Sequence, residues 1–472
     1  MNTKGLVRTY FCSGARNLEL LESFTEDSLR FECDERMASF KALGFAKSTL
    51  TPTAICTTSG TAVSECLSAL IEAYYSCLPL ILITGDRPKR MHDKGCPQTI
   101  DHEIITRGYR KCYKEVALDE LYNIDFSQLE LPAHINVLIE KDSEIQQTSV
   151  KEYEASWNGF NQFLADHSKP LFLFSHESVS MRPFIDRFKQ FDIPFYAEIL
   201  SQAHDLSGIR FEKDIQLSLR SNEISSIVRI GHTPVSKFWR SLERNPIPQF
   251  SFDERKLKGL SFGSCMGLGS RDLIEDQNFW NAITSISNKP LISSTPVDQL
   301  QLLIQNFPIS DIAVLQKVID RIPTSSIVYV GNSLVIRFLE IVSDKPLRLF
   351  GNRGVNGIDG QLSTAIGIAN TTSDTIYCIL GDMTSLYDLA AFKDIPMNLK
   401  LIIINNGGGR IFETMKLDPR LIMEHQFSFS KVCQGLNLIW KNEFEDNFTN
   451  GSVWEFKSDP KQTMLILKEW ES

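Results

Sequence analysis

Two short stretches decide the fold of this chain: CILGDMT at residues 378–384 and IIINNGGG at residues 402–409. Each is an apolar run that breaks into glycine and an oxygen-bearing side chain, as expected where a buried parallel strand ends in a ligand-binding loop. Asp382 and Asn406, with a backbone carbonyl freed by the glycines, offer the oxygen ligands that Mg²⁺ prefers. The glycines also let backbone N–H groups approach an anion at a helix start. The two stretches together indicate a metal-bridged diphosphate. The alternative is a pair of ordinary strand-to-helix turns in which both residues cap helices.

Length and composition are those of a globular protein with more than one domain. At 472 residues the chain exceeds what one core normally holds, so we expect two or three α/β domains. A net charge of −9 argues against nonspecific nucleic-acid binding. The ten cysteines lack metal-ligand spacing, and Cys56, Cys66 and Cys378 lie in apolar runs, so a reducing cytoplasm is the expected compartment. No signal peptide is apparent and every apolar run is too short to span a bilayer, so no membrane partner is expected.

Alternating strands and helices predict a first domain over residues 1–145. Strands are expected at 9–12, 29–33, 53–58, 79–84 and 134–139. A short helix is expected through Leu21 with Asn17 as its N-cap, and further helices at 37–46 and from 59 to about 75. This alternation predicts a parallel sheet with helices on both faces, whose ligands gather at the carboxyl ends of the strands. Glu35 stands where a strand end meets a helix N-terminus. The loop 90–100 is expected to cover that edge.

A linker over 140–161 is predicted to open a short middle domain, residues 146–305. Its strands are expected at 170–174, 226–231 and 290–293, and no nucleotide-binding glycine pattern is visible there. The third domain is predicted over 306–472, with a helix at 309–319, a strand at 326–330 and a glycine-rich loop at 351–360. The expected fold is therefore α/β, with three domains built on parallel sheets flanked by helices. The first and third domains share one alternating style.

Read together, the loops of this chain resemble those of the SEPHCHC synthases, the menaquinone-pathway branch of the thiamin diphosphate-dependent enzymes. The matching runs are CDER at 33–36, ALGFAK at 42–47, TSGTA at 58–62, EAYY at 72–75, DRP at 86–88, PQTID at 97–101, Gly231 with PVSK at 234–237, GNSL at 331–334 with Arg337, NRG at 352–354 with GIDG at 357–360, and NNGG at 405–408 with IF at 411–412. The likeness follows the chain in order, and NRG followed by GIDG points to this branch. Met383 replaces the third glycine of the Gly-Asp-Gly motif, Ala15 stands where the family usually has serine, the chain is short at its front and middle, and residues 414–472 match weakly.

The resemblance implies thiamin diphosphate and Mg²⁺, or Mn²⁺, as cofactors. Asp382, Asn406 and the carbonyl of Gly408 would hold the metal. Further cofactor contacts are implied for Ser333, Leu334, Ile358, Gly381, Met383, Thr384, Ile411 and Phe412. Ile358 would prop the cofactor into its bent shape, although an isoleucine in such a loop can equally be core filler.

Glu35 is implied as the catalytic residue. Its carboxylate would hydrogen-bond a ring nitrogen of the aminopyrimidine, so that the cofactor's own amino group removes the proton from thiazolium C2. Acid–base assistance of this kind contributes roughly 10²–10⁴-fold. The alternative is a carboxylate stabilised at a helix N-terminus by about 0.3–1 kcal/mol.

The family's substrates, 2-oxoglutarate and isochorismate, are both dicarboxylates. Several fixed cations are needed to bind them, and the planar fork of arginine suits a carboxylate. The residues implied are Arg16, Arg87, Gln98, Lys237, Arg337 and Arg353. Any one of these cations, taken singly, could instead be a solvated surface charge.

The implied reaction is decarboxylation of 2-oxoglutarate and conjugate addition of the resulting carbanion to isochorismate. The family builds each active site from the first domain of one subunit and the third of another, which implies a homodimer or homotetramer. Two other functions stay open: a different thiamin diphosphate-dependent 2-oxoacid decarboxylase or carboligase, and a noncatalytic relative. A different 2-oxoacid decarboxylase or carboligase would bind substrates with fewer carboxylates, so the arginines would be superfluous. The retention of Glu35 argues against a noncatalytic relative.

Overall fold

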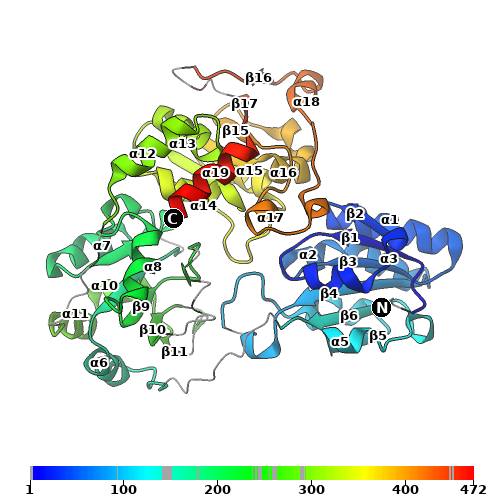
Figure 1. Ribbon diagram of the computed structural model, residues 1–472, viewed down its shortest axis with the longest axis horizontal. Helices are drawn as coiled ribbons and strands as arrows, with labels where there is room; N and C mark the ends of the chain where they lie inside the picture. The colour runs from blue at the N-terminus through cyan, green and yellow to red at the C-terminus, as the bar shows by residue number, and fades with distance from the viewer. Residues whose placement is uncertain are drawn as a thin grey trace. The chain divides into compact units, whose positions relative to one another are not determined.

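The computed structural model contains three parallel β-sheets flanked by helices, which confirms the predicted fold class (Figure 1). It describes residues 4–92, 94–140, 151–177, 180–236, 238–239, 242, 247–254, 256–257, 263–286, 292, 294–445, 448 and 451–471. The chain divides into two compact units. The first comprises Met1–Ser143, Arg353–Asp359 and Ile411–His425, and the second Glu144–Asn352, Gly360–Arg410 and Gln426–Ser472.

The first unit is built on a six-stranded sheet in the order β2-β1-β3-β4-β6-β5. Its strands are β1 (Arg8–Cys12), β2 (Leu29–Glu32), β3 (Thr53–Thr57), β4 (Leu80–Asp86), β5 (Cys112–Ala117) and β6 (Ala133–Leu138). Its α-helices are α1 (Glu35–Thr49), α2 (Thr61–Glu65), α3 (Leu67–Tyr75), α4 (His102–Thr106), α5 (Leu118–Leu121) and α17 (Ile411–Thr414). The five predicted strands are confirmed. The sixth, β5, was not predicted because this edge strand is only half-buried and lacks an apolar run.

Two helix predictions in this unit were wrong in detail. The helix expected from 59 to 75 is broken at Cys66 into α2 and α3. The helix expected after Asn17 is a 3₁₀-helix, η1 (Leu18–Ser23), which Asn17 does not cap through its side chain. The Asn17 side chain turns back instead, accepting from the Gly14 N–H and donating to the Cys12 carbonyl, both at 2.9 Å. The asparagine therefore fixes the loop after β1.

Apolar side chains cover both faces of the first sheet, because neighbouring strand residues point to opposite sides. On one face α1 and α3 pack against β1, β3 and β4 through residues that include Ala38, Ala42, Ala73, Ile55 and Leu82. On the other face the buried residues include Phe11, Leu20, Phe24, Ile83, Phe126 and Leu421. The sheet is thus the central layer of three, and only its edges are open to ligands.

The second unit contains a five-stranded sheet in the order β11-β10-β9-β7-β8. Its strands are β7 (Pro170–Phe174), β8 (Phe195–Ala197), β9 (Ser226–Ile230), β10 (Gln249–Phe252) and β11 (Gly263–Met266), with helices α6 (Trp157–Asp166), α7 (Arg182–Phe188), α8 (Glu212–Arg220), α10 (Ser270–Glu275) and α11 (Gln277–Thr284). The strands predicted at 170–174 and 226–231 are confirmed, whereas the one predicted at 290–293 lies almost wholly outside the described residues. The linker prediction was too long, because α6 begins inside it, capped by the Ser156 hydroxyl.

The third sheet of the chain also lies in this unit; it has six strands in the order β13-β12-β14-β15-β17-β16. Its strands are β12 (Ile327–Val330), β13 (Arg348–Phe350), β14 (Ile376–Gly381), β15 (Leu399–Asn405), β16 (Ile439–Lys441) and β17 (Ser452–Lys457), with helices α12 (Val297–Asn306), α13 (Asp311–Arg321), α14 (Leu334–Val342), α15 (Gln361–Ala369), α16 (Asp382–Tyr387), α18 (Ser430–Gly435) and α19 (Pro460–Glu471). Counted along the chain, its strand order is the same as in the first sheet. The common alternating style seen in the sequence therefore reflects one shared topology.

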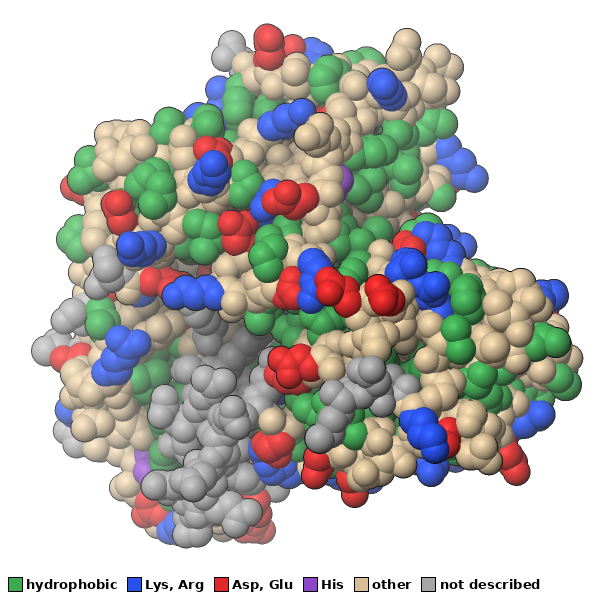
Figure 2. Space-filling view, turned by 45° about the vertical axis from the view of Figure 1, so that its right-hand side comes forward, with side chains coloured by type: hydrophobic (Ala, Val, Ile, Leu, Met, Phe, Trp, Pro, Cys, Tyr) green, Lys and Arg blue, Asp and Glu red, His purple; other side chains and the backbone are tan. Residues whose placement is uncertain are grey.

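Among the described helices, none is by itself long and apolar enough to cross a membrane; α12 and α13 meet that criterion only together, with a bend of 113° between them. On the face drawn in Figure 2, acidic and basic side chains are intermingled with hydrophobic ones.

Candidate functional site

The predicted site residues that the structure describes lie at the carboxyl edges of the two sheets that share a topology. In the first sheet the strand order reverses between β1 and β3, and in the third between β12 and β14. Ligands of open α/β sheets bind outside the carboxyl ends of the strands at such a reversal. The loops concerned carry Arg16 and Gly60 in the first unit, and Ser333 and Asp382 in the second.

Glu35 is the first residue of α1, and its side chain is half-buried. The cap of this helix is Asp34, whose Oδ1 accepts from the Met37 N–H at 2.8 Å. The Thr57 hydroxyl at the end of β3 donates to Glu35 Oε1 at 3.4 Å. Burial, and then the charge of Glu35, raise the pKa of the Cys66 thiol. The side-chain cap of α1 is therefore Asp34 and not Glu35.

The loop after β3 is held in an unusual conformation at Gly60, where φ is +91°. Its N–H donates to His102 Nε2 at 3.3 Å. A Cβ at Gly60 would lie 3.0 Å from Val355 Cγ1 and 3.4 Å from the Cβ of Gln98. Only glycine suits both the backbone conformation and this close approach. Gln98 and the loop 353–359 therefore meet the end of β3 within the first unit.

The loop 353–359, which contains Ile358, is also fixed by a hydrogen bond, because the Thr61 hydroxyl donates to Asp359 Oδ1 at 2.8 Å. On the other side of the sheet edge, the Arg16 N–H donates to the Thr58 hydroxyl oxygen at 3.3 Å. A Cβ at Gly85 would lie 2.5 Å from the Arg16 carbonyl oxygen. The backbone of Arg16 is thus packed between the ends of β3 and β4.

A buried carboxylate that sequence reasoning missed holds the backbone of Arg87. Asp86 Oδ1 accepts from the Arg87 N–H at 2.7 Å, and Asp86 Oδ2 lies 3.3 Å from His102 Nδ1. Burial opposes ionisation of Asp86, but hydrogen bonds from His92 and the Arg87 N–H, with His102 nearby, outweigh it and lower the pKa. Asp86 was predicted only as part of a matching run. Two of its partners, His102 and Asn136, lie too far along the chain to be recognised from the sequence.

In the second unit, Asp382 links the stretches 378–384 and 402–409. It is the first residue of α16 and is buried. Its Oδ2 accepts from the N–H groups of Gly407 at 2.8 Å and Gly408 at 2.9 Å, and its Oδ1 accepts from the Met383 N–H at 2.8 Å. A simple capping residue would bond only its own helix. Asp382 instead orders the glycine loop after β15.

Asn406 carries a buried acceptor that fits a cation. Its Nδ2 donates to Asp311 Oδ2 at 2.8 Å, whereas its Oδ1 is buried and has no hydrogen-bond partner among the residues that the structure describes. Burial raises the pKa of Asp311, opposed by its hydrogen bonds from Ser458 and Asn406. Asn406 Oδ1 thus lies unsatisfied next to the glycine loop that the Asp382 carboxylate holds. Oxygen donors of this kind suit a hard cation such as Mg²⁺, which takes its other ligands from phosphate and water. In the described part of the chain there is no group of three or more His, Cys, Asp or Glu residues suited to a metal.

The helix after β12 presents further predicted contacts. Ser333 precedes α14 with φ of +70°, and Leu334 is the buried first residue of the helix. The Arg337 guanidinium donates back to the Ser333 carbonyl. Asn332 Nδ2 donates to the Asn352 carbonyl at 2.8 Å, which ties this loop to the one after β13.

Comparison with known proteins identifies the family. The family described as "Thiamine pyrophosphate enzyme, N-terminal TPP binding domain" matches residues 1–105. The 2-succinyl-5-enolpyruvyl-6-hydroxy-3-cyclohexene-1-carboxylate synthase of Bdellovibrio bacteriovorus is 32% identical to this chain, over 99% of the chain and 96% of its own length. The chain belongs to this synthase family. Synthases of the same name from Akkermansia muciniphila and Flavobacterium psychrophilum are 30% and 28% identical, over 91% and 88% of this chain and 87% and 83% of their own lengths. The family resemblance seen in the sequence is confirmed.

The family-matching site residues fall into two groups, one in each unit. The first unit holds Arg16, Glu35, Arg87, Gln98, Arg353, Ile358, Ile411 and Phe412. The second holds Ser333, Leu334, Arg337, Gly381, Asp382, Met383, Thr384, Asn406 and Gly408. Arg87 and Arg353 are buried, and Arg16 and Arg337 are half-buried. Lys237 lies outside the described residues.

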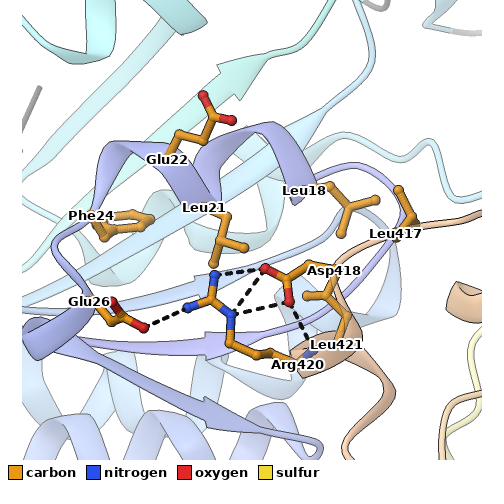
Figure 3. A pocket seen from close by; sticks show the side chains of 9 residues that line it. All are labelled: Leu18, Leu21, Glu22, Phe24, Glu26, Leu417, Asp418, Arg420 and Leu421. Atoms are coloured by element: carbon orange, nitrogen blue, oxygen red, sulfur yellow. Dashed lines mark hydrogen bonds and ion pairs between the residues drawn. The ribbon is translucent and has the colours of Figure 1, made fainter.

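A cavity of about 520 Å³ in the first unit is separate from these synthase-family residues. It is lined by Leu18, Leu21, Glu22, Phe24, Glu26, Leu417, Asp418, Arg420 and Leu421 (Figure 3). Figure 3 shows the Arg420 side chain directed between Asp418 and Glu26, with which it pairs at 2.7 and 3.4 Å. Its lining contains none of the predicted site residues, so this cavity is distinct from the predicted site.

Helix α14, which carries Arg337, is anchored by Glu340. The Tyr196 hydroxyl donates to Glu340 Oε1 at 2.6 Å, and the Ile199 N–H to Oε2 at 2.9 Å. Desolvation raises the pKa of Glu340 to about 7, opposed by these two hydrogen bonds. A carboxyl whose pKa is raised on folding contributes stability that is complete below its unfolded pKa and is lost as pH rises through the folded value.

We therefore expect the melting temperature of the wild type to fall between pH 5 and pH 8 by more than that of Glu340→Gln. The amide stays neutral and keeps one acceptor oxygen. Each unit of pKa shift corresponds to about 1.4 kcal/mol. Glu275→Gln, at an exposed glutamate of α10, is the control for loss of charge alone and should follow the wild type. Parallel curves for the wild type and Glu340→Gln across this range would contradict the expectation.

Proposed function

We propose that the chain is a thiamin diphosphate-dependent synthase that decarboxylates 2-oxoglutarate and adds the resulting four-carbon unit to isochorismate, in menaquinone biosynthesis. The observation that carries the proposal is the 32% identity to a synthase of that name along 99% of the chain. The residues at both sheet edges support it, because they supply a carboxylate near a helix N-terminus in one unit and a cation site in the other.

Asp382, Asn406 Oδ1 and the Gly408 carbonyl would hold Mg²⁺, or Mn²⁺, against the diphosphate. When bound, thiamin diphosphate supplies an electron sink for the carbon that loses CO₂. Gly381, Met383, Thr384, Ser333 and Leu334 would line the diphosphate end of the site. Asp382 keeps the backbone of the glycine loop ordered by accepting from the N–H groups of Gly407 and Gly408, and it also accepts from the Met383 N–H of its own helix.

Glu35 would hold a proton at the pyrimidine ring nitrogen of the cofactor. Its position supports this role, because it sits at a helix N-terminus that Asp34 already caps. Ile358, Ile411 and Phe412 would pack against the cofactor and exclude water. An apolar surrounding of this kind strengthens electrostatic interactions with the charge that develops during decarboxylation.

The substrate carboxylates would be bound by Arg16, Arg87, Lys237, Arg337 and Arg353, with Gln98 donating from its amide. Both proposed substrates carry two carboxylates, and each guanidinium offers a planar pair of donors. Arg87 and Arg353 are buried, and Arg87 Nε also donates to the Pro97 carbonyl at 3.4 Å, which holds the guanidinium in the loop after β4.

We further propose a cytoplasmic homodimer, or a homotetramer of two such dimers, in which the Glu35 edge of one copy and the Asp382 edge of another serve one cofactor. The domains would span residues 1–145, 146–305 and 306–472. The family resemblance supports this arrangement. Analytical ultracentrifugation with and without cofactor and Mg²⁺ tests it, and a monomer under both conditions would contradict it.

Release of CO₂ from 2-oxoglutarate, measured with and without isochorismate, tests the proposed activity. The synthase should form the six-membered-ring adduct in step with CO₂ only when isochorismate is present. CO₂ release with no adduct would instead favour a simple 2-oxoacid decarboxylase. No release under either condition, from protein that binds thiamin diphosphate, would favour a noncatalytic relative.

A further inference from the structure

Asn406 is held in one orientation by groups on both its side chain and its backbone. Its side-chain Nδ2 donates to Asp311 Oδ2 at 2.8 Å, and the Arg410 Nε donates to the backbone carbonyl of Asn406 at 3.2 Å. The nearest glycine N–H groups are directed to Asp382 Oδ2. The side-chain oxygen of Asn406 is left buried, with no hydrogen-bond partner in the described part of the chain.

Asp311 is itself fixed by residues near the end of the chain. The Ser458 hydroxyl donates to its Oδ1, and its N–H donates to the Thr463 hydroxyl oxygen at 2.9 Å. The cap of α13 is Ser310, whose hydroxyl oxygen accepts from the Ala313 N–H at 3.2 Å. The Asp311 carboxylate is therefore not needed to cap its helix, although it is almost completely buried.

The chemistry of the two groups allows one amide orientation. An ionised carboxylate only accepts hydrogen bonds, so the NH₂ of Asn406 must face Asp311. Reversing the amide would set two acceptors against each other and direct the NH₂ toward the metal side. Leaving a buried oxygen without a donor costs about 1–3 kcal/mol. A cation at Asn406 Oδ1 would remove that cost.

We propose that Asp311 is a positioning residue that fixes the amide of Asn406 so that Oδ1 is presented to a divalent cation. The inference rests on the proposed function, because the cation is the one that would bridge the diphosphate. Ser458 and Thr463 extend the same support, which gives residues of the weakly matching C-terminal segment a role in the site. Asp311 touches neither cofactor nor substrate in this proposal.

Binding of Mn²⁺ to purified protein in the presence of thiamin diphosphate, followed by electron paramagnetic resonance, tests the inference without measuring turnover. Asp311→Leu removes both the acceptor and the charge, whereas Asp311→Asn keeps an acceptor oxygen for the Asn406 amide. Changing the outer partner of a metal ligand typically lowers affinity about 10- to 100-fold. We expect a loss of that size for Asp311→Leu and a loss below about 3-fold for Asp311→Asn, since the orienting bond survives in the latter.

Equal losses in both variants would show that the charge of Asp311 acts, not its position, and would overturn the inference. Unchanged Mn²⁺ affinity in Asp311→Leu would overturn it as well. Asn406→Leu, which removes the ligand itself, should lose at least as much affinity as Asp311→Leu. If Asp311→Leu does not fold by circular dichroism, Asp311→Ser takes its place, because a serine is too short to reach the amide. Failure of the wild type to bind Mn²⁺ with thiamin diphosphate would contradict the proposed function, a result distinct from either outcome for Asp311.

Discussion

Replacing Glu35 with glutamine is expected to lower turnover by about 10²–10⁴-fold while the first domain stays folded. The reason is local. Glu35 starts α1, but the helix is capped by the Asp34 side chain at 2.8 Å from the Met37 N–H. Glutamine keeps the size and one acceptor oxygen but cannot carry the charge that, in the proposed role, would hold a proton at the cofactor ring. Turnover of 2-oxoglutarate, measured as CO₂ release at saturating cofactor and Mg²⁺, checks the expectation.

The competing explanation for Glu35 is a stabilising charge at a helix N-terminus. That role is worth about 0.3–1 kcal/mol and would appear in the melting temperature, not in turnover. Glu103→Gln is the matched control, because Glu103 lies in the first turn of α4 and is exposed. Both variants should melt within a few degrees of the wild type, and only Glu35→Gln should lose activity. Near-normal turnover in Glu35→Gln would remove the glutamate from the mechanism.

The strands that carry the site could be predicted because each is a buried apolar run that ends in glycine or a polar residue. The runs at 376–381 and 399–405 are buried along nearly their whole length, which is why they stand out in the sequence. Strand β5 lies at a sheet edge, has half-buried and exposed positions but no buried one, and carries Lys114 and Glu115. It has no such signal, so an edge strand was missed where central strands were found.

The partners that orient the site could not be predicted, because they come from remote parts of the chain. Asp311 and Asn406 are 95 residues apart, and in the sequence Ser310-Asp311 indicates only the start of a helix. His102 similarly reads as an ordinary helix residue until the fold brings its ring to the Gly60 N–H. Asn17 was predicted to cap a helix, yet its amide finds closer partners in the loop after β1. Local sequence predicts where loops lie; which polar groups pair across them depends on packing.

Replacing Asp382 with alanine is expected to abolish the Mg²⁺-dependent part of thiamin diphosphate binding. The variant loses the proposed metal ligand and leaves the Met383 and Gly408 N–H groups without their acceptor, whereas the Gly407 N–H keeps Asn405 Oδ1 at 3.1 Å. Each unsatisfied buried donor costs about 1–3 kcal/mol, so the glycine loop should also lose order. Calorimetric titration of thiamin diphosphate at a series of Mg²⁺ concentrations measures the effect.

Asp382→Asn separates the metal from the loop, because an amide keeps one oxygen that can accept from the glycine N–H groups but carries no charge. If Asp382 acts only as a clamp on the loop, the asparagine variant should bind the cofactor with the Mg²⁺ dependence of the wild type. If it is a ligand, affinity should fall by more than the roughly 10- to 100-fold typical of changes in a ligand's outer partner. Asp388→Asn, at the other end of α16, makes the same chemical change outside the site. The Asp388 carboxylate accepts from the Ser363 N–H at 2.7 Å and from the Ser363 hydroxyl at 3.0 Å, so its replacement should leave cofactor binding unchanged. A loss in Asp382→Asn but not in Asp388→Asn would show that Asp382 is a metal ligand, and equal binding in both variants would contradict it.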